Sequence, residues 1–555
     1  MYQSLLVLRF LTSRIMPFIA VLAVALCVTL VIVVVSVMSG FLDMLKDSGR
    51  TLVGDVVLSK EVTGIPYYRE LIEEIEKLPE AEAASPVIET FGLLQMPYGP
   101  DSDRNVKSIE MVQVWGIEPA TLSRVIDFQK TVYWKTPDQQ TAETLAKDDP
   151  RLDPSYNRLQ EAMAMRGTGA PALPGIMLGI EMSLFNERQR DGSYRTSRFG
   201  SGTQERAYWM PLQNVSLTVV PVSESGDIDF QQKRAFSIVN EFQTGVYQID
   251  ANRVLIGLDT AQDMLRLSES VLLDTTNLDE NEMPRRIGVS PARATTILVK
   301  AKPEYSPIEL RNAIEGLYER FAMEKSTEEG AVEMPYPVSV RTWEQRLKDL
   351  IGPVEKERAL MRVLFSLVYV VCAGLVLAIF WSIVHEKTRD IGILRSVGAG
   401  RTGILTIFLA YGLTIGVVGS AAGLGLAWLV VDNINEIHTA MGEPAPRWAW
   451  MVAAAFAAAS ATGALVAGMR GSVLHTLLWS IIGLVIAGIA ALLYYHVGVT
   501  IWDPSVYYFS TIPNKIDMTN AYQTMAFATI FSVFGAAIPA AKAADTDPVR
   551  SLRYE

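Results

Sequence analysis

The chain is poor in the residues that form disulfides and bind metals. It has 2 cysteines and 4 histidines among 555 residues. Cys27 and Cys372 both lie in long apolar runs, so no disulfide framework is expected. None of the histidines lies between residues 41 and 355. That segment therefore offers no histidine-based metal site or general base.

Nucleotide-binding and metalloprotease motifs are missing as well. No G-x-x-x-x-G-K-[ST] sequence occurs, so any ATP that drives this protein, and its magnesium ion, must be bound by a partner subunit. His385 and Glu386 begin like an H-E-x-x-H zinc helix, but Arg389 stands where the second histidine would be. We expect a chain that is not an enzyme, with no catalytic residue, metal or cofactor of its own.

Charge is scarce, since 20% of the residues are charged and 50% are hydrophobic. Soluble domains carry about 25% charged residues and lack uncharged runs of more than about 18 residues, so an ordinary soluble enzyme is excluded. Residues 41–355 have a net charge of −15 and the other residues +4, which gives the −11 of the whole chain. An acidic middle segment on a mildly basic membrane part argues against nucleic acid as a partner.

The apolar runs predict about six transmembrane helices. Residues 17–38 are uncharged, and at about 1.5 Å per residue they cross a hydrocarbon core of about 30 Å. A signal peptide is the alternative, but the run is too long and no small-x-small cleavage site follows, so we expect a retained anchor. The predicted spans are residues 17–38, 363–384, 403–431, 448–469, 474–495 and 521–541.

Lysine and arginine residues predict the direction of these spans. They gather in residues 1–16, in residues 385–402, at Arg470 and in residues 542–555. With six spans these segments all fall on one side, which is predicted to be cytoplasmic. Residues 39–362 must then be extracytoplasmic.

The extracytoplasmic segment mixes helix and strand patterns. A strand–helix–strand pattern covers residues 55–94, and a strand–helix pattern covers residues 295–321. The later helix has a capping box, with Ser306 at the N-cap and Glu309 at N3. Strands predominate between these parts, at residues 108–117, 215–220, 234–242 and 253–258, and residues 136–166 are expected to be loop with helical turns. The predicted fold is an α-helical membrane protein with a large α+β extracytoplasmic domain, in which a porter-like module is interrupted by a β-rich module.

Two features of the helices leave alternatives open. Gly412 and Gly416, and then Gly419 and Gly423, have G-x-x-x-G spacing, which serves either packing inside the monomer or a subunit interface. Pro353 interrupts a helical pattern and marks either a helix boundary or a bend.

Residues 386–399, between the second and third spans, form a charged amphipathic segment. It is either a positive-inside anchor or a short helix that docks on a cytoplasmic partner. In the second case Ile391 and Leu394 would share the apolar face, and Gly398 would let the chain turn into the third span. The cations that could meet carboxylates of the partner are Lys387, Arg389 and Arg395.

The sequence of this segment, E-K-T-R-D-I-G-I-L-R-S-V-G-A, resembles the coupling region of FtsX-like, MacB-type permeases of ATP-binding-cassette (ABC) transporters. It is most similar to the lipoprotein-releasing (LolC/LolE-type) permeases, in which E-K-T-[RK]-D-I-x-[IV]-L-[RK]-x-[LMV]-G-A is typical. Four further stretches resemble the same family, at residues 37–41, 340–344, 506–513 and 547–555.

The resemblance implies a mechanical membrane subunit. Residues 403–548 would be the FtsX-like permease domain, and residues 39–362 the stalks and a periplasmic MacB-like core domain. The permeases of this family pair as homodimers or heterodimers with cytoplasmic ABC ATPases in the bacterial inner membrane. The residues expected to couple the chain to its ATPase are Glu386, Lys387, Thr388, Arg389, Asp390, Ile391, Leu394, Arg395 and Gly398.

The chain departs from the family in two places. The spans at residues 448–469 and 474–495 are additional, but an even number of extra spans keeps the direction of the last one. The carrier-docking loop of the family would fall on residues 223–233, either as a contact for a periplasmic lipoprotein carrier or as a plain solvated hairpin. The residues proposed for that contact are Ser223, Gly226, Asp227, Phe230 and Lys233.

The resulting prediction is the permease subunit of an ATP-driven transporter that releases lipoproteins or other lipid-linked cargo by mechanotransmission. One alternative is an exporter of small amphipathic molecules, such as macrolides or peptides. The other is a signalling mechanotransmitter, which would activate an envelope enzyme while nothing crosses the membrane.

Overall fold

A computed structural model describes most of the chain. The described residues are 15–96, 109–145, 149–167, 172–183, 186–188, 194–196, 198–199, 206–207, 209–211, 213–220, 231–278, 284–328, 332–442, 448–470, 473–494 and 512–545. The chain divides into two compact units. The helical unit comprises residues 1–41, 357–507 and 511–555, and the sheet unit comprises residues 42–356 and 508–510.

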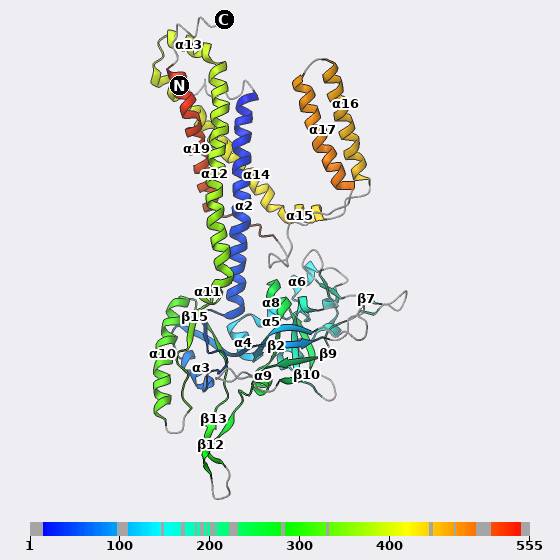
Figure 1. Cartoon of the computed structure of the whole chain (residues 1–555), viewed down its shortest axis with the longest axis vertical. Helices are drawn as coiled ribbons and strands as arrows, with labels where there is room; N and C mark the ends of the chain where they lie inside the picture. The colour runs from blue at the N-terminus through cyan, green and yellow to red at the C-terminus, as the bar shows by residue number, and fades with distance from the viewer. Residues whose placement is uncertain are drawn as a thin grey trace. The chain divides into compact units, whose positions relative to one another are not determined.

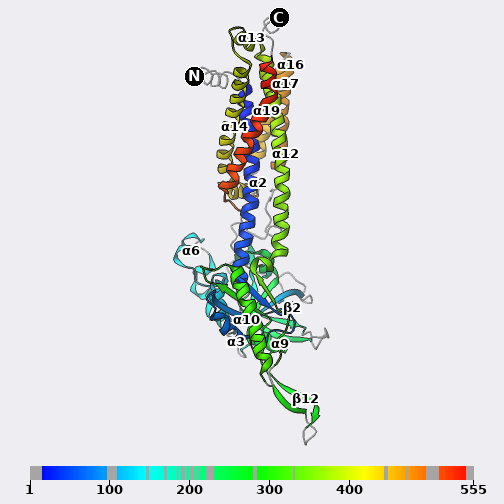
Figure 2. The ribbon, with the colours of Figure 1, turned by 90° about the vertical axis from the view of Figure 1, so that its left-hand side faces the viewer.

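Four long helices build the core of the helical unit (Figures 1 and 2). They are α2 (Ile15–Val53), α12 (Lys348–Glu386), α14 (Arg401–Asp432) and α19 (Met518–Ala544). Val24, Val376, Ile415 and Ala536 are buried where these helices meet. The short helices α13 (Thr388–Ser396) and α15 (Ile434–Gly442) flank α14 in the sequence, and the division between the units falls inside α2 and α12.

The two glycine pairs of α14 pack inside the monomer. A Cβ atom on Gly416 would lie 2.9 Å from Cα of Thr529 in α19, and one on Gly423 would lie 2.7 Å from the carbonyl oxygen of Ala25 in α2. The hydroxyl of Thr29 donates a hydrogen bond of 3.0 Å to the carbonyl oxygen of Gly423. The first alternative for these motifs is therefore confirmed, because small residues allow α14 to approach two neighbouring helices closely.

Six apolar helices occur at the predicted positions, including the antiparallel pair α16 (Ala449–Met469) and α17 (Val473–Tyr494) (Figure 1). Among the described residues, five helices are long and apolar enough to cross a membrane. These five are Met16–Lys46, Ile351–Glu386, Arg401–Asp432, Trp450–Met469 and Met518–Ala544. The apolar stretch His475–Ala491 of α17 is shorter, so the number of crossings stays a prediction.

Pro353 does not mark a helix boundary, and that alternative is wrong. It lies inside α12, and the chain leaves helical geometry earlier, at Leu347, between α11 (Trp343–Arg346) and α12. The capping box of Thr342 with Gln345 explains where α11 begins. Pro353 costs α12 one backbone hydrogen bond close to the beginning of the helix.

A nine-stranded mixed sheet forms the centre of the sheet unit, in the order β15-β1-β14-β2-β3-β11-β4-β10-β9. Because β9 also pairs with β2, the strands from β2 to β9 in that order close on themselves. The strands are β1 (Val56–Ser59), β2 (Ala81–Gln95), β3 (Ile109–Ile117), β4 (Gly175–Gly179), β9 (Asn214–Val219), β10 (Gln232–Phe242), β11 (Arg253–Gly257), β14 (Thr296–Ala301) and β15 (Ser339–Thr342). The large α+β domain is thus confirmed.

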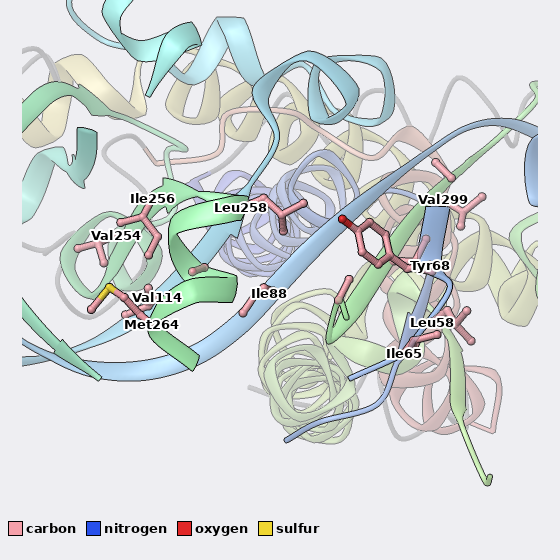
Figure 3. Close-up of a cluster of buried hydrophobic side chains, with 14 of the residues drawn as sticks. Leu58, Ile65, Tyr68, Ile88, Val114, Val254, Ile256, Leu258, Met264 and Val299 are labelled. Carbon is pink, nitrogen blue, oxygen red and sulfur yellow. The ribbon is translucent and has the colours of Figure 1, made fainter. Parts of the chain in front are cut away.

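Helices cover this sheet and complete its core (Figure 3). Tyr68 of α3 (Tyr68–Glu76) and Leu258 of α9 (Leu258–Leu265) are buried with Ile88 of β2. The helix α10 (Pro307–Thr327) begins at the predicted capping box, with the side chains of Ser306 and Glu309 bonded to each other's backbone. The remaining helices are α4 (Pro119–Val125), α5 (Phe128–Thr131), α6 (Gln139–Thr144), α7 (Leu159–Ala164) and α8 (Tyr247–Asn252).

Small hairpins lie beside the main sheet. The pair β12 (Ser270–Leu278) and β13 (Pro284–Ser290) was not among the predicted elements, although Val271 and Val289 face each other across it. The other two pair β5 (Asn186–Arg188) with β6 (Tyr194–Thr196), and β7 (Arg198–Phe199) with β8 (Arg206–Ala207). The described residues of 136–166, which are 136–145 and 149–166, contain α6, α7 and two 3₁₀ turns, as the sequence predicts.

Candidate functional site

The predicted coupling segment folds as the short helix α13. The helix ends in a Schellman motif at Gly398, whose φ of 106° lies in the region that favours glycine. The backbone N–H of Ala399 donates to the carbonyl oxygen of Leu394 (3.0 Å), and that of Gly398 donates to the carbonyl oxygen of Arg395 (3.2 Å). The chain then turns directly into α14, so the predicted role of Gly398 in the turn is confirmed.

The apolar side chains of α13 fall on two faces. Ile391 is 3% exposed and packs with Ile404 in the core of the helical unit. Ile393 is 46% exposed, and Val397, at the C-cap four residues later, is 84% exposed. The prediction that Ile391 inserts into a partner is therefore wrong, because its own chain covers it. Leu394, the other apolar residue predicted to meet a partner, is half-buried, so the most exposed apolar pair is Ile393 and Val397.

The charged side chains of α13 also have different surroundings. The guanidinium of Arg395 donates a hydrogen bond of 2.7 Å to the carbonyl oxygen of Ala544, at the end of α19. Lys387 forms an ion pair with Asp390 at 2.8 Å. Arg389 is exposed, so it is the cation of α13 best placed to meet a carboxylate of a partner. Glu386 is also exposed, whereas the hydroxyl of Thr388 bonds to the carbonyl oxygens of the preceding turn.

The second predicted site, the loop at residues 223–233, lies largely outside the described residues. Ser223, Gly226, Asp227 and Phe230 all belong to the part that the structure does not describe. Lys233 lies in β10, where its ammonium donates to Oε1 of Gln95 at 3.1 Å. Its contact with a periplasmic carrier stays a prediction.

The helical unit contains a cleft that the sequence does not predict. It has a volume of about 400 Å³ and lies between α2, α12 and α19. Arg358 and Arg362 line one part of it, and Phe365, Tyr369, Phe527 and Phe531 line another. Tyr369 stacks on Phe531 with ring centroids 5.9 Å apart. The available sequence signal is the i, i+4 spacing of the two arginines just before an apolar run.

Two carboxyl groups of the sheet unit are almost completely buried. Oε2 of Glu241 accepts hydrogen bonds from the indole of Trp134 (2.6 Å) and the amide of Asn186 (2.9 Å). Asp250 accepts bonds from both backbone and side chain of Thr244 (2.8 and 2.6 Å) and from Gly245 (3.0 Å). Burial outweighs these bonds and raises the pKa of each carboxyl to about 7.

These carboxyls hold neighbouring segments in place through their hydrogen bonds. In the part of the chain that the structure describes, no cluster of three histidine, cysteine, aspartate or glutamate side chains could hold a metal ion.

Comparison with known proteins gives a family match in the region around α13. The C-terminal domain of FtsX-like permeases matches residues 362–472. The lipoprotein-releasing system transmembrane protein LolC of Xylella fastidiosa is 20% identical over 313 residues, which are 54% of this chain and 66% of that protein. LolC of Neisseria meningitidis is 21% identical over 322 residues, which are 58% of this chain and 56% of that protein. The chain thus spans less than two thirds of either LolC protein.

Two further proteins are each similar to a part of this chain. The pyoverdine export ATP-binding/permease protein PvdT of Pseudomonas fluorescens is 42% identical over 82 residues, 14% of this chain and 12% of that protein. The solved periplasmic region of MacB from Actinobacillus actinomycetemcomitans aligns over 56% of this chain and 97% of its own, with 8% identity and a TM-score of 0.27. The family match and the LolC matches agree with the helices described above: residues 362–472 are similar to the C-terminal domain of FtsX-like permeases, and just over half of this chain is distantly similar to the LolC transmembrane proteins.

Proposed function

We propose that this chain is the membrane subunit of an ATP-driven transporter, that a separate cytoplasmic ATPase binds α13, and that the transporter moves lipoproteins or other lipid-linked cargo. The observation that carries the proposal is that α13 has one face buried in the helical core and another face exposed. One face of the helix is fixed to the helical core through Ile391, while Ile393 and Val397 project on the other side. A helix that transmits force needs both a rigid attachment and a free contact surface.

The attachment of α13 reaches two neighbouring helices. Ile391 packs with Ile404 of α14, and Arg395 bonds to the last turn of α19. A displacement of α13 by an ATPase would therefore be passed to both helices at once. Only a four-residue turn, Val397–Gly400, connects α13 to α14.

The proposed orientation follows from the distribution of charge. The basic residues of α13 and Arg470 would face the cytoplasm, and the acidic sheet unit would lie on the periplasmic side of a bacterial inner membrane. The LolC relatives support a lipid-linked cargo, because their names assign them to lipoprotein-releasing systems. A second permease copy, identical or different, would complete the transporter, and a periplasmic carrier would receive the cargo.

One observation favours a second candidate function. The 82-residue match with PvdT, at 42% identity, involves a protein named for the export of pyoverdine, a small molecule. An exporter of small amphipathic molecules could use the same coupling helix and differ only in the cargo that it accepts.

The experiment that tests the proposal is purification of the tagged full chain from its native membrane in mild detergent, followed by mass spectrometry. We expect stoichiometric recovery of an ABC ATPase and, in the absence of ATP, of lipidated proteins that are released when ATP is added. Recovery of the ATPase without lipidated protein, together with ATP-dependent export of a small amphiphile, would favour the second candidate. Recovery of neither an ATPase nor a cargo would contradict both.

A further inference from the structure

We infer that the cleft between α2, α12 and α19 binds an anionic phospholipid, with Arg358 and Arg362 on its phosphodiester and the aromatic part of the cleft on its acyl chains. This site is separate from α13, and the inference requires only that the helical unit lies in a membrane. It concerns a resident lipid and not the transported cargo.

The charge of the cleft is the first argument. Arg358 and Arg362 are one helical turn apart on α12, so their side chains lie on the same face. Among the described residues that line the cleft, none is acidic, and the polar ones include Ser366, Asn520 and Gln523. Two guanidinium groups in such surroundings can give a phosphodiester several charge-assisted hydrogen bonds.

Asp517, at the beginning of α19, is the carboxylate that lies closest to the cleft along this helix, and it already caps the helix. Asp517 caps the first turn of α19, where Oδ1 accepts from the backbone N–H groups of Thr519 (2.9 Å) and Asn520 (3.3 Å). Its other oxygen accepts from the side-chain amide of Asn520 at 2.7 Å. Asp517 does not line the cleft. Asp517 therefore does not compete with a ligand for the two arginines, and Glu355, three residues before the first of them, forms its ion pair with Lys46 at 3.5 Å.

The second argument is that the rest of the cleft, away from the two arginines, is lined by apolar side chains. Val31, Val35 and Met38 contribute from α2, and Phe527 and Phe531 from α19. The ring of Tyr369 packs against both phenylalanines, with centroid distances of 6.0 Å to Phe527 and 5.9 Å to Phe531. A ligand that fills both parts must have an anionic head and a hydrocarbon tail, and it must be available in the bilayer.

Arginines at the border of an apolar run also attract bulk lipid phosphates without any specific site. The distinguishing feature here is the number of bound lipids. A built cleft of about 400 Å³ accepts one head group with part of its tails, and its occupancy saturates. A general electrostatic attraction produces a broad series of adducts without saturation.

The test is native mass spectrometry of the delipidated full chain, titrated separately with phosphatidylglycerol, with phosphatidylcholine of identical acyl chains, and with a diacylated lipopeptide that has no phosphate. We expect one saturable phosphatidylglycerol per chain, and weaker binding of phosphatidylcholine and lipopeptide by at least about tenfold. Arg358→Gln together with Arg362→Gln should reduce phosphatidylglycerol binding to the level of phosphatidylcholine.

Two further variants separate this effect from misfolding and from a non-specific change of charge. The double substitution Arg358→Lys with Arg362→Lys should restore most of the phosphatidylglycerol preference. Arg470→Gln removes an exposed arginine at the end of α16 and should change nothing. Equal binding of the three lipids, unsaturated multiple adducts, or an unchanged preference in the folded Arg358→Gln, Arg362→Gln variant would overturn the inference.

Discussion

The guanidinium of Arg395 donates a hydrogen bond of 2.7 Å to the carbonyl oxygen of Ala544, which is 149 residues away in the sequence. This bond satisfies one of the carbonyl groups that every helix leaves unpaired at its C-terminal end. It also joins the proposed ATPase-binding helix to α19. A cation at this end of a helix is additionally stabilised by the helix dipole.

Replacement of Arg395 by methionine should weaken the helical unit. A hydrogen bond from a charged donor contributes about 1–3 kcal/mol, so we expect a lower unfolding temperature in detergent, measured by differential scanning fluorimetry. Arg389→Met is the matched control, because Arg389 lies on the same helix and is exposed. Equal unfolding temperatures for the two variants would show that the bond to Ala544 contributes nothing.

Substitution of Gly416 by valine should disrupt the contact between α14 and α19. A Cβ at this position already lies 2.9 Å from Cα of Thr529, so the two helices would have to separate, at a cost of about 1–3 kcal/mol. Gly425→Val, on the same helix, should be tolerated, because no atom lies within 4 Å of its Cβ position. Size-exclusion profiles and unfolding temperatures would reveal the difference. A Gly425→Val defect as large as that of Gly416→Val would contradict the packing described here.

The buried carboxyl of Glu241 should make the sheet unit less stable as the pH rises. The pKa of Glu241 is raised from 4.5 to about 7 in the folded protein, so the folded state binds more protons than the unfolded state between those values. Its favourable contribution is therefore complete below about pH 4.5 and is lost as the pH approaches about 7. Glu241→Gln keeps an acceptor for Trp134 and Asn186 but cannot ionise.

We therefore expect Glu241→Gln to stabilise the sheet unit at pH 8, by on the order of a few kcal/mol, and to do so much less at pH 5. Hydrogen exchange of β10 in the full chain at both pH values would measure this. Asp250 has the same direction of shift and remains in the variant, so part of the pH dependence should persist. A variant that destabilises β10 equally at both pH values would show that the amide cannot replace the buried acid.

The two cysteines should form a disulfide when an oxidant is added to the purified protein. Cys372 of α12 belongs to the packed core of the helical unit and Cys27 of α2 packs against it, so the two thiols lie in the same cluster. Mild oxidation with copper phenanthroline should give a faster-migrating band on non-reducing gels. The band should be absent from Cys27→Ser, and its absence from the parent chain would contradict the proximity of the two thiols.

The sequence predicts local features of this protein well, because neighbouring residues determine them. The capping box of Ser306 and the turn at Gly398 each depend on a few consecutive residues, and both are confirmed. The apolar runs likewise locate the long helices, since hydrophobic length is a property of the run itself.

Features that depend on packing between distant segments could not be predicted. Ile391 and Ile393 are equally apolar and two residues apart, and only the positions of α14 and α19 decide which of them is buried. The cleft between α2, α12 and α19 could not be predicted either, because its walls come from helices more than 100 residues apart in the chain. The placement of Cys27 and Cys372 in one core likewise depends on the packing of two helices, and the sequence alone does not predict it.

The central claim is that the exposed side of α13 receives force from an ATPase, and charged substitutions on that side test it most directly. Ile393→Asp with Val397→Asp would bury two unpaired charges at the proposed contact, at a cost of several kcal/mol each. Met469→Asp, on an exposed methionine of α16, is the matched control. The measurement is ATP hydrolysis by the co-purified ATPase, together with the amount of ATPase recovered per permease. We predict that the double variant stays folded in the membrane but loses at least about 99% of the bound ATPase and the associated hydrolysis, whereas Met469→Asp retains both. Normal recovery and normal hydrolysis with the double variant would contradict the account.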